Sequence, residues 1–414
     1  MTRRLRIAAA VPVVLAAIVA APAAAAPRAP EISSPSAVVV EASTGAVAYA
    51  KAADERRPIA SATKLMTALL TFERAALADE LRAADYRPLA VESRINLQPG
   101  ERLTVADLLR GLLLESANDA AVTLAEGVAG SRAAFVRAMN ARARELGLTR
   151  TRYVDPIGIG SGNVSSARDL ALLTRELRRF PFFRRTVARS SATLSSGAAT
   201  RRIANRNTLV DLPLVDGVKT GRTLQAGWVL VGSGRRGRGE RRIRVVSVVL
   251  AAPSEAARND DTLALLRWGV RRFKVAIPVR RGDRVGAVPI RHRGGAELPV
   301  IAGARVRKVV ASDHRLVARV VGLPADVEGP VAAGRRLGTI EVLDGGRRVA
   351  TVPAVAAASV PAAGLAQRAK DSLGRPATIL IALAGLSGSV LLARMGLRRR
   401  ERRTSRTREE PEVA

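Results

Sequence analysis

Apolar residues recur at helical spacing through most of the first half of the chain. Between residues 61 and 78 they fall on one face, at Leu65, Leu69, Phe72 and Ala76. A period of three to four residues is typical of an amphipathic helix. The same spacing, with Thr104 and Asp107 as an N-terminal capping box and Gly147 as a C-terminal stop, predicts further helices. They span residues 104–114, 118–129, 132–146 and 167–178.

From about Val215 the pattern changes to short uninterrupted apolar runs, which are typical of strands. Residues 227–233 and 243–252 are joined by a Gly- and Arg-rich stretch and predict a hairpin. A helix should follow, from a Ser254 cap to about residue 273. Near the start, residues 37–51 predict another hairpin around Ser43-Thr44-Gly45. The order of these elements predicts an α+β fold, with a helical block inserted into an antiparallel sheet.

After Lys274 short Val-rich runs alternate with Gly, Pro and Arg, and no long helical pattern recurs before about Ala363. This predicts a small all-β domain at residues 275–360. The stretch 357–375 has the composition of a linker.

Both ends of the chain carry apolar runs. Basic residues, an apolar stretch from Ile7 and small residues up to Ala26 are typical of a signal peptide, predicted to be cleaved after about residue 25. Residues 376–393 contain no charge and predict a transmembrane anchor at 376–396, with an interfacial helix as the alternative. The arginine-rich tail, 397–414, should remain cytoplasmic, so the middle of the chain would be exported and tethered to the bacterial membrane.

The amino-acid composition limits which catalytic and metal-binding groups the protein can use. The chain has 414 residues, no cysteine, and two histidines, both beyond residue 290. Cysteine nucleophiles, disulfides and Cys-ligated metals are excluded, and a hydrolase here would need a base other than histidine. The net charge of +32 suits anionic surroundings. Nucleic acid is not the expected partner, because the arginines are dispersed and aromatic residues make up only 3%.

No cofactor or metal is expected. Gly232, Gly234 and Gly237 satisfy the spacing of a dinucleotide-binding loop. That loop must open a helix, whereas the next predicted element is a strand. A hairpin tip explains these glycines better.

Ser61 and Lys64 are candidates for nucleophile and base. Residues three apart on a helix lie on one face within contact distance. A helix N-terminus and burial both disfavour the ammonium form, so a neutral Lys64 could accept the proton of Ser61. The Ser-x-x-Lys spacing alone is weak evidence for a catalytic pair, since a capping serine beside a surface lysine occurs in many helices.

Two further motifs follow in the chain. Ser116-Ala117-Asn118 lies between two predicted helices and offers a hydroxyl for proton relay and an amide for a substrate carbonyl. Lys219-Thr220-Gly221 begins a strand and offers a cation, a hydroxyl and a glycine that admits close backbone approach. Ser-x-x-Lys, Ser-x-Asn and Lys-Thr-Gly, in this order, form the motif set of penicillin-recognising serine enzymes.

The chain resembles the low-molecular-mass penicillin-binding proteins that act as serine-type D-alanyl-D-alanine carboxypeptidases. Beyond the three motifs, the resemblance rests on residues 103–121, 167–171, 205–207, 215–223 and 249–254. It implies a β-lactamase/transpeptidase-like domain at residues 36–273, a peptidoglycan pentapeptide as substrate and β-lactams as covalent inhibitors.

The resemblance also implies a role for each motif residue. Ser61 would be acylated and Lys64 would act as its base, while Ser116 would relay the proton to the leaving D-alanine. The substrate-binding residues would be Asn118, Lys219, Thr220, Gly221 and Arg222. The backbone N–H groups of Ser61 and Arg222 would form the oxyanion hole.

Some positions depart from the family pattern. Ile157, Asn163 and Arg222 stand where relatives commonly have other residues, which bears on substrate preference and turnover. No Glu-x-x-Leu-Asn follows Asn118, so β-lactams should acylate Ser61 and leave slowly. Two alternatives remain open: an endopeptidase acting on crosslinked peptidoglycan, and a non-catalytic protein that binds cell wall or polyanions.

Overall fold

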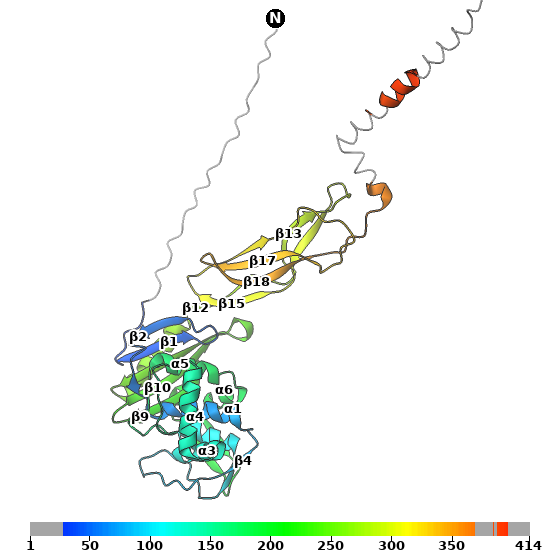
Figure 1. The fold of residues 1–414 in the computed structure, drawn as a ribbon. Coiled ribbons are helices and arrows are strands. Elements are labelled where there is room, and N and C mark those ends of the chain that lie inside the picture. The colour runs from blue at the N-terminus through cyan, green and yellow to red at the C-terminus, as the bar shows by residue number, and fades with distance from the viewer. Residues whose placement is uncertain (1–27, 369–383, 385–386, 396–414) are drawn as a thin grey trace, which may run out of the picture.

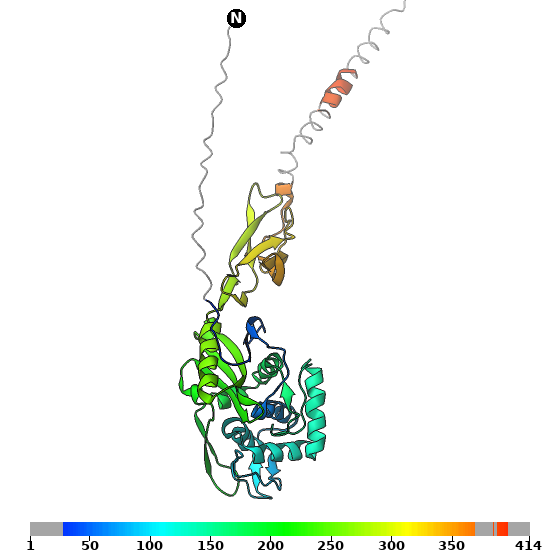
Figure 2. The same cartoon turned by 90° about the vertical axis from the view of Figure 1, so that its left-hand side faces the viewer.

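The computed structural model describes residues 28–368, 384 and 387–395. They form two parts that lie end to end (Figure 1). The first part, residues 36–269, contains a five-stranded sheet and helices α1 to α7. The second, residues 273–356, contains strands β12 to β18 and extends from the end of the first part near β1 and β2 (Figures 1 and 2).

The five-stranded sheet joins the start of the first part to its end. Its order is β2-β1-β11-β10-β9, and all its neighbouring strands are antiparallel. The helical block lies in sequence between β2 and β9, so the predicted α+β arrangement of an inserted helical block is confirmed, together with both hairpins. The strands are β1 (Ser36–Glu41), β2 (Val47–Lys51), β9 (Val215–Thr223), β10 (Gly227–Arg236) and β11 (Ile243–Ala252).

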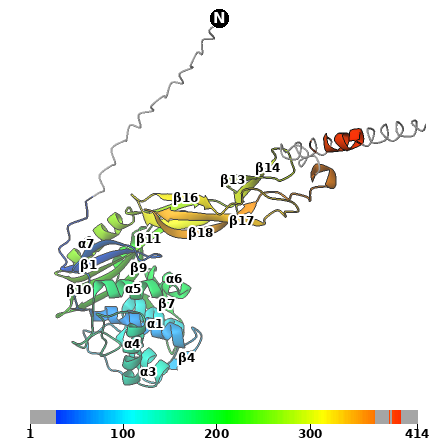
Figure 3. The same cartoon turned by 45° about the horizontal axis from the view of Figure 1, so that its top comes forward.

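Both faces of this sheet are covered, as Figure 3 shows. Helix α7 (Glu255–Gly269) begins at the predicted Ser254 cap, and its Leu265 and Leu266 share an apolar cluster with Val39 of β1. Val38, the next residue of β1, belongs instead to the large core of the helical block. Alternate side chains of a strand point to opposite faces. The continuous apolar run of β1 therefore reflects burial on both sides.

The predicted helices form, with shifted bounds. The segment starting at Ser61 opens as a 3₁₀ turn, Ala60–Thr63, and α1 covers only Lys64–Arg74, so the predicted end near residue 78 is wrong. The segment 104–114 divides into α2 and a π-helical turn, Gly111–Glu115. Thr104 caps α2 as predicted, but the Asp107 carboxylate bonds Ser195 and Ser196 instead of completing the capping box. The remaining helices are α2 (Val105–Arg110), α3 (Asn118–Ala129), α4 (Arg132–Glu145), α5 (Ala167–Leu177) and α6 (Pro181–Val187).

The first part also contains three small sheets, each made of two strands of two to four residues. Segments this short carry no detectable alternation, which is why the sequence did not predict them. They are β3 (Arg57–Pro58) with β6 (Val164–Ser165), β4 (Glu80–Arg82) with β5 (Arg102–Thr104), and β7 (Ser191–Leu194) with β8 (Arg201–Ala204).

The second part has an apolar cluster of its own, built mainly from valine. It meets the first part through Arg305, whose guanidinium bonds both carboxylate oxygens of Glu240 at 2.7 Å, and through Arg307, which donates to the Glu240 carbonyl. One sheet has the order β13-β14-β18-β17-β16, and β12 pairs with β15. The strands are β12 (Phe273–Val279), β13 (Arg284–Pro289), β14 (Glu297–Ala302), β15 (Val306–Ala311), β16 (Leu316–Val321), β17 (Arg336–Asp344) and β18 (Arg347–Ala356).

The predicted targeting segments lie largely outside this description. The signal peptide, residues 1–25, and the tail, 397–414, fall on residues that are not described, as does much of 376–396. Among the residues that are described, no helix is long and apolar enough to cross a membrane.

Candidate active site

Ser61 and Lys64 meet as the sequence predicts, but through a different local structure. Ala60 has a left-handed φ of 46°, which turns the chain sharply just before Ser61 in the 3₁₀ turn. Lys64, the first residue of α1, places Nζ 2.9 Å from the Ser61 hydroxyl oxygen. Nζ also donates to the Ile157 carbonyl at 2.7 Å. The serine is thus held beside an amine whose own position is fixed.

The environment of Lys64 favours its neutral form. The side chain is fully buried, and burial lowers its pKa to about 7. The carboxylates of Asp155, Glu92 and Asp119 oppose this effect by stabilising the ammonium. Near neutral pH a large fraction of Lys64 is therefore unprotonated and able to accept the Ser61 proton.

The rate of acylation should follow this titration. Below the pKa of about 7 Lys64 is protonated, so the acylation rate should rise as the pH increases through that value. Burial also lowers the pKa of Lys219, so that cation is lost at a lower pH than for an ordinary lysine, and substrate binding should weaken as the pH rises through that value. The acylation rate of a fluorescent penicillin, measured by stopped flow as a function of pH, should show both the rise due to Lys64 and the fall due to Lys219. A rate independent of pH between 5 and 9 (roughly two units either side of the Lys64 pKa) would exclude Lys64 as the base.

Ser116 and Asn118 lie at a sharp bend between two helical segments. Ser116 ends the π-helical turn in a left-handed conformation, φ 64°, and Asn118 is the first residue of α3. Both are buried. In the described part of the chain no hydrogen bond joins Ser116 directly to Ser61 or Lys64. The bend is positioned by helix packing, since α1 and the π-helical turn are in contact.

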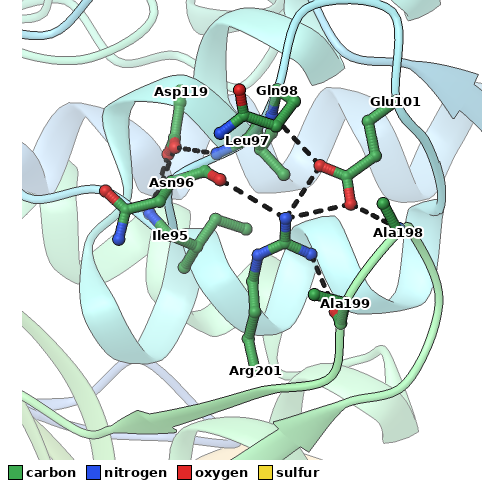
Figure 4. A network of polar contacts seen from close by, with 9 residues as sticks. All are labelled: Ile95, Asn96, Leu97, Gln98, Glu101, Asp119, Ala198, Ala199 and Arg201. Carbon is green, nitrogen blue, oxygen red and sulfur yellow. Dashed lines mark hydrogen bonds and ion pairs between the residues drawn. The ribbon is translucent and has the colours of Figure 1, made fainter.

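A long loop, residues 85–101, lies over this bend and is tied to it. Asp119 of α3 accepts hydrogen bonds from the backbone of Ile95 and Leu97, and the Asn118 N–H donates to the Ser93 carbonyl. Figure 4 shows the other end of the loop, where Arg201 of β8 makes an ion pair with Glu101 at 2.8 Å. The loop is therefore fixed from two sides.

This loop brings Glu92 to the site. One carboxylate oxygen of Glu92 accepts hydrogen bonds from the Asn118 side-chain amide and from the Tyr86 hydroxyl, both at 2.6 Å. These bonds, with one from the Leu89 backbone, outweigh burial and lower the pKa of Glu92, so it is charged at neutral pH. A carboxylate can only accept here, so it fixes which end of the Asn118 amide faces it.

Replacing Glu92 with glutamine tests this arrangement. Glu92→Gln removes a charge-assisted bond to Asn118, and we expect kcat/KM to fall about tenfold. It also removes a carboxylate that raises the pKa of Lys64, so the acid limb of the pH profile should move to lower pH. Tyr86→Phe, which keeps the charge, should leave that limb in place. An unshifted limb in Glu92→Gln would contradict the electrostatic role.

The Lys-Thr-Gly segment lies on β9, against the turn that carries Ser61. Lys219 is buried and its Nζ donates to the Thr220 carbonyl at 2.9 Å. Burial is the main cause of its lowered pKa, and the charges of Lys64 and Arg206 act in the same direction. A Cβ added to Gly221 would lie 3.0 Å from the Ser61 nitrogen and 3.2 Å from the Ile59 carbonyl oxygen. Only glycine allows this close approach without displacing the nucleophile.

These features match known proteins. The sequence profile of the D-alanyl-D-alanine carboxypeptidases matches residues 23–254. The carboxypeptidase DacF of Bacillus subtilis is 30% identical over 349 residues, covering 82% of this chain and 89% of that protein. The D-alanyl-D-alanine endopeptidase of Escherichia coli is 38% identical over 210 residues, covering 49% of this chain and 67% of that one.

The fold matches as well. Penicillin binding protein 6B from Escherichia coli aligns with a TM-score of 0.60 and 30% sequence identity, over 79% of this chain and 96% of that structure.

The chain belongs to the D-alanyl-D-alanine carboxypeptidase family.

Membership in this family makes the protein a hydrolase and confirms the predicted penicillin-binding, transpeptidase-like α+β fold. In this carboxypeptidase-family chain the Ser-x-x-Lys and Lys-Thr-Gly motifs lie against each other. Lys64 bonds Ser61, Gly221 packs on Ser61, and the charge of Lys64 acts on Lys219. Thr220 is buried on β9 next to Lys219 and Gly221. The Arg222 side chain is exposed, and its guanidinium carbon lies 4.9 Å from the centroid of the Trp228 ring.

The sequence did not reveal two carboxylates that organise this carboxypeptidase-family site. Glu92 orients Asn118, as described above. Asp155 accepts hydrogen bonds from the backbone of Ile157, Gly158 and Gly160, and so shapes the loop that presents the Ile157 carbonyl to Lys64. The repeated glycines of this stretch, with Asp155 ahead of them, were the available signal for such a turn.

Proposed function

We propose that the protein is a serine D-Ala-D-Ala carboxypeptidase that removes the terminal D-alanine from peptidoglycan stem peptides. Its family membership and the Ser61–Lys64 pair support this proposal. In the first step Lys64 accepts the Ser61 proton while the Ser61 oxygen bonds the carbonyl carbon of the penultimate D-alanine. The backbone N–H groups of Ser61 and Arg222 stabilise the resulting oxyanion.

The leaving D-alanine must gain a proton as its C–N bond breaks. Ser116 relays this proton from Lys64, and Asn118, held by Glu92, orients the substrate amide. Lys219 and Thr220 bind the terminal carboxylate, with Gly221 keeping β9 close to Ser61. Water then attacks the ester carbonyl while Lys64 takes its proton, and Lys64 passes that proton to the Ser61 oxygen as the C–O bond breaks, which restores Ser61.

The observation that carries this proposal is the buried Lys64 within 2.9 Å of Ser61 and beside the Lys-Thr-Gly strand. A lysine on that strand suits a free terminal carboxylate, with which its protonated amine would pair. We therefore expect D-alanine release from an uncrosslinked pentapeptide, and slower cleavage of a crosslinked dimer. Both substrates can be assayed by chromatography of the products. Faster cleavage of the crosslink would instead favour the endopeptidase, an activity named for one partial relative.

We propose that β-lactams are covalent inhibitors that acylate Ser61 and are released slowly. Their ring amide would occupy the place of the D-Ala-D-Ala bond, and their carboxylate would bind Lys219. Mass spectrometry of the intact protein should show a penicilloyl adduct that persists for many turnovers of the peptide substrate. Rapid recovery of the unmodified mass would contradict slow release.

We further propose that the protein is exported and held at the outer face of the bacterial membrane. The apolar runs at both ends support this placement, with a cleaved signal at residues 1–25 and an anchor at 376–396. Residues 275–360 would then form a separate small all-β domain between anchor and active site, supported by their own apolar cluster. Membrane fractionation tests the anchor, and folding of an isolated 275–360 fragment tests the domain.

A further inference from the structure

A cavity of about 750 Å³ lies where the two parts of the protein meet. Its wall comes from α5 and the following turn, the β1–β2 turn, the start of β11, and β15 of the second part. No residue of the three motifs lines it. The cavity is therefore a separate feature from the site around Ser61.

Arginine dominates this wall, which we call the arginine cavity. Seven of its described lining residues are arginines, against two glutamates. The chain as a whole is 25% charged, so this density of guanidinium groups exceeds what the composition alone supplies. The seven are Arg175, Arg178, Arg179, Arg184, Arg242, Arg244 and Arg307.

The carboxylates near the arginine cavity are already engaged. Glu41 accepts hydrogen bonds from the turn residues Ser43 and Thr44. Glu176 pairs with Arg179, and Asp216, behind the wall, is shared by Arg178 and Arg244. Counting these three carboxylates against the seven guanidinium groups of the wall leaves an excess of four positive charges among the described residues, while the nearby Glu240 is paired with Arg305.

Backbone carbonyls hold several of the guanidinium groups in the wall. Arg175 donates to the carbonyls of Ala42 and Ser43, and Arg307 to those of Glu240 and Arg242. Arg184 donates to two carbonyls of the α5–α6 turn. These bonds fix the orientation of the guanidinium groups without neutralising them.

Arg178 adds an unused donor to the wall. The residue is 7% exposed, and its Nη1 atom is buried with no hydrogen-bond partner among the described residues. Burial lowers the pKa of Arg178 to about 10, so it is still protonated at neutral pH. Its positive charge therefore adds to that of the wall.

We infer that the arginine cavity is a binding site for phosphate groups. Guanidinium groups arriving from several elements suit the tetrahedral oxygens of a phosphate, which accepts paired N–H bonds from more than one direction. The volume exceeds that of a single small ion and has room for the organic groups of an ester. The ligand is either a phosphodiester group, as in an anionic wall polymer or a lipid headgroup, or free phosphate.

Calorimetric titration of the full chain in neutral detergent at low ionic strength tests the inference. The probes are inorganic phosphate, glycerophosphoglycerol as a soluble phosphodiester, and succinate as a dicarboxylate. We expect saturable binding of a phosphate probe, stronger than that of succinate and weakened by added salt. Tighter binding of glycerophosphoglycerol would identify an ester ligand, and tighter binding of inorganic phosphate the free ion, and either supports a phosphate site.

A matched pair of double variants assigns the binding to the cavity. Arg179 and Arg242 have exposed side chains, so Arg179→Gln/Arg242→Gln should fold normally while weakening phosphate binding by about tenfold or more. Arg267→Gln/Arg271→Gln removes the same charge from exposed positions in and just after α7 and should change affinity by less than about twofold. Penicillin labelling and melting temperature report folding in both, and Arg242→Gln alone serves if the first double variant is unstable.

Three results would overturn the inference. They are no saturable binding of either phosphate probe, equal affinity for succinate, and equal loss of affinity in the two double variants. None of these depends on the activity of Ser61, so failure here is distinguishable from failure of the proposed carboxypeptidase reaction.

Discussion

Replacing Ser61 with alanine is expected to abolish both penicillin labelling and D-alanine release. The hydroxyl oxygen lies 2.9 Å from Lys64 Nζ and is the atom that would form the acyl bond, so no other group can take its place. Loss of a covalent nucleophile typically costs about 10⁴-fold or more in kcat. A fluorescent penicillin gel and a D-alanine assay, run on wild type and Ser61→Ala, measure the two effects.

The variant should fold normally, because it removes one partly exposed atom from a turn held by other contacts. An unchanged melting temperature would confirm this. Ser116→Ala is the informative comparison. It leaves the nucleophile in place, so it should still be labelled by penicillin but should release D-alanine slowly. Labelling of Ser61→Ala at the rate of the wild type would exclude Ser61 as the nucleophile.

The local parts of this site were predictable from the sequence. Ser61 and Lys64 are three residues apart, and both a 3₁₀ turn and an α-helix bring such residues together. The prediction of their contact was therefore confirmed although the predicted type of helix was wrong. The start of helix α7 was equally predictable from the sequence, because the Ser254 side chain caps the helix by accepting a hydrogen bond from a backbone N–H of its first turn.

The rest of the site depends on packing between distant segments. Glu92 belongs to an irregular loop, and its bond to Asn118 joins residues 26 apart in the sequence. No periodicity marks such a residue, and the loop reaches the site because Asp119 and the Arg201–Glu101 pair hold it there (Figure 4). The acceptor at Ile157 is a backbone carbonyl, which the identity of the side chain does not reveal.

The position of the arginine cavity, too, could not be predicted from the sequence. The sequence showed dispersed arginines and a net charge of +32, which predicted anionic surroundings but no particular site. Folding brings together Arg175 of α5, Arg244 of β11 and Arg307 of β15, which lie up to 132 residues apart. Only the tertiary structure shows that part of the dispersed charge converges.

Replacing Lys64 with arginine should stop acylation while keeping a positive charge beside Ser61. The base function requires loss of a proton near pH 7, which burial allows for lysine by lowering its pKa to about 7. A guanidinium stays protonated near neutral pH, so it cannot accept the Ser61 proton there. General-base loss typically costs about 10²–10⁴-fold, and we expect the second-order rate of penicillin acylation to fall within that range.

Because Lys64 is fully buried, the larger guanidinium could also disturb packing. Lys64→Met provides the matched variant, since methionine fills similar space without charge or base. Both variants should show the same large loss of acylation, measured by mass spectrometry of the intact protein. Rescue in Lys64→Arg alone would mean that the positive charge, and not proton transfer, is what Ser61 requires from its neighbour.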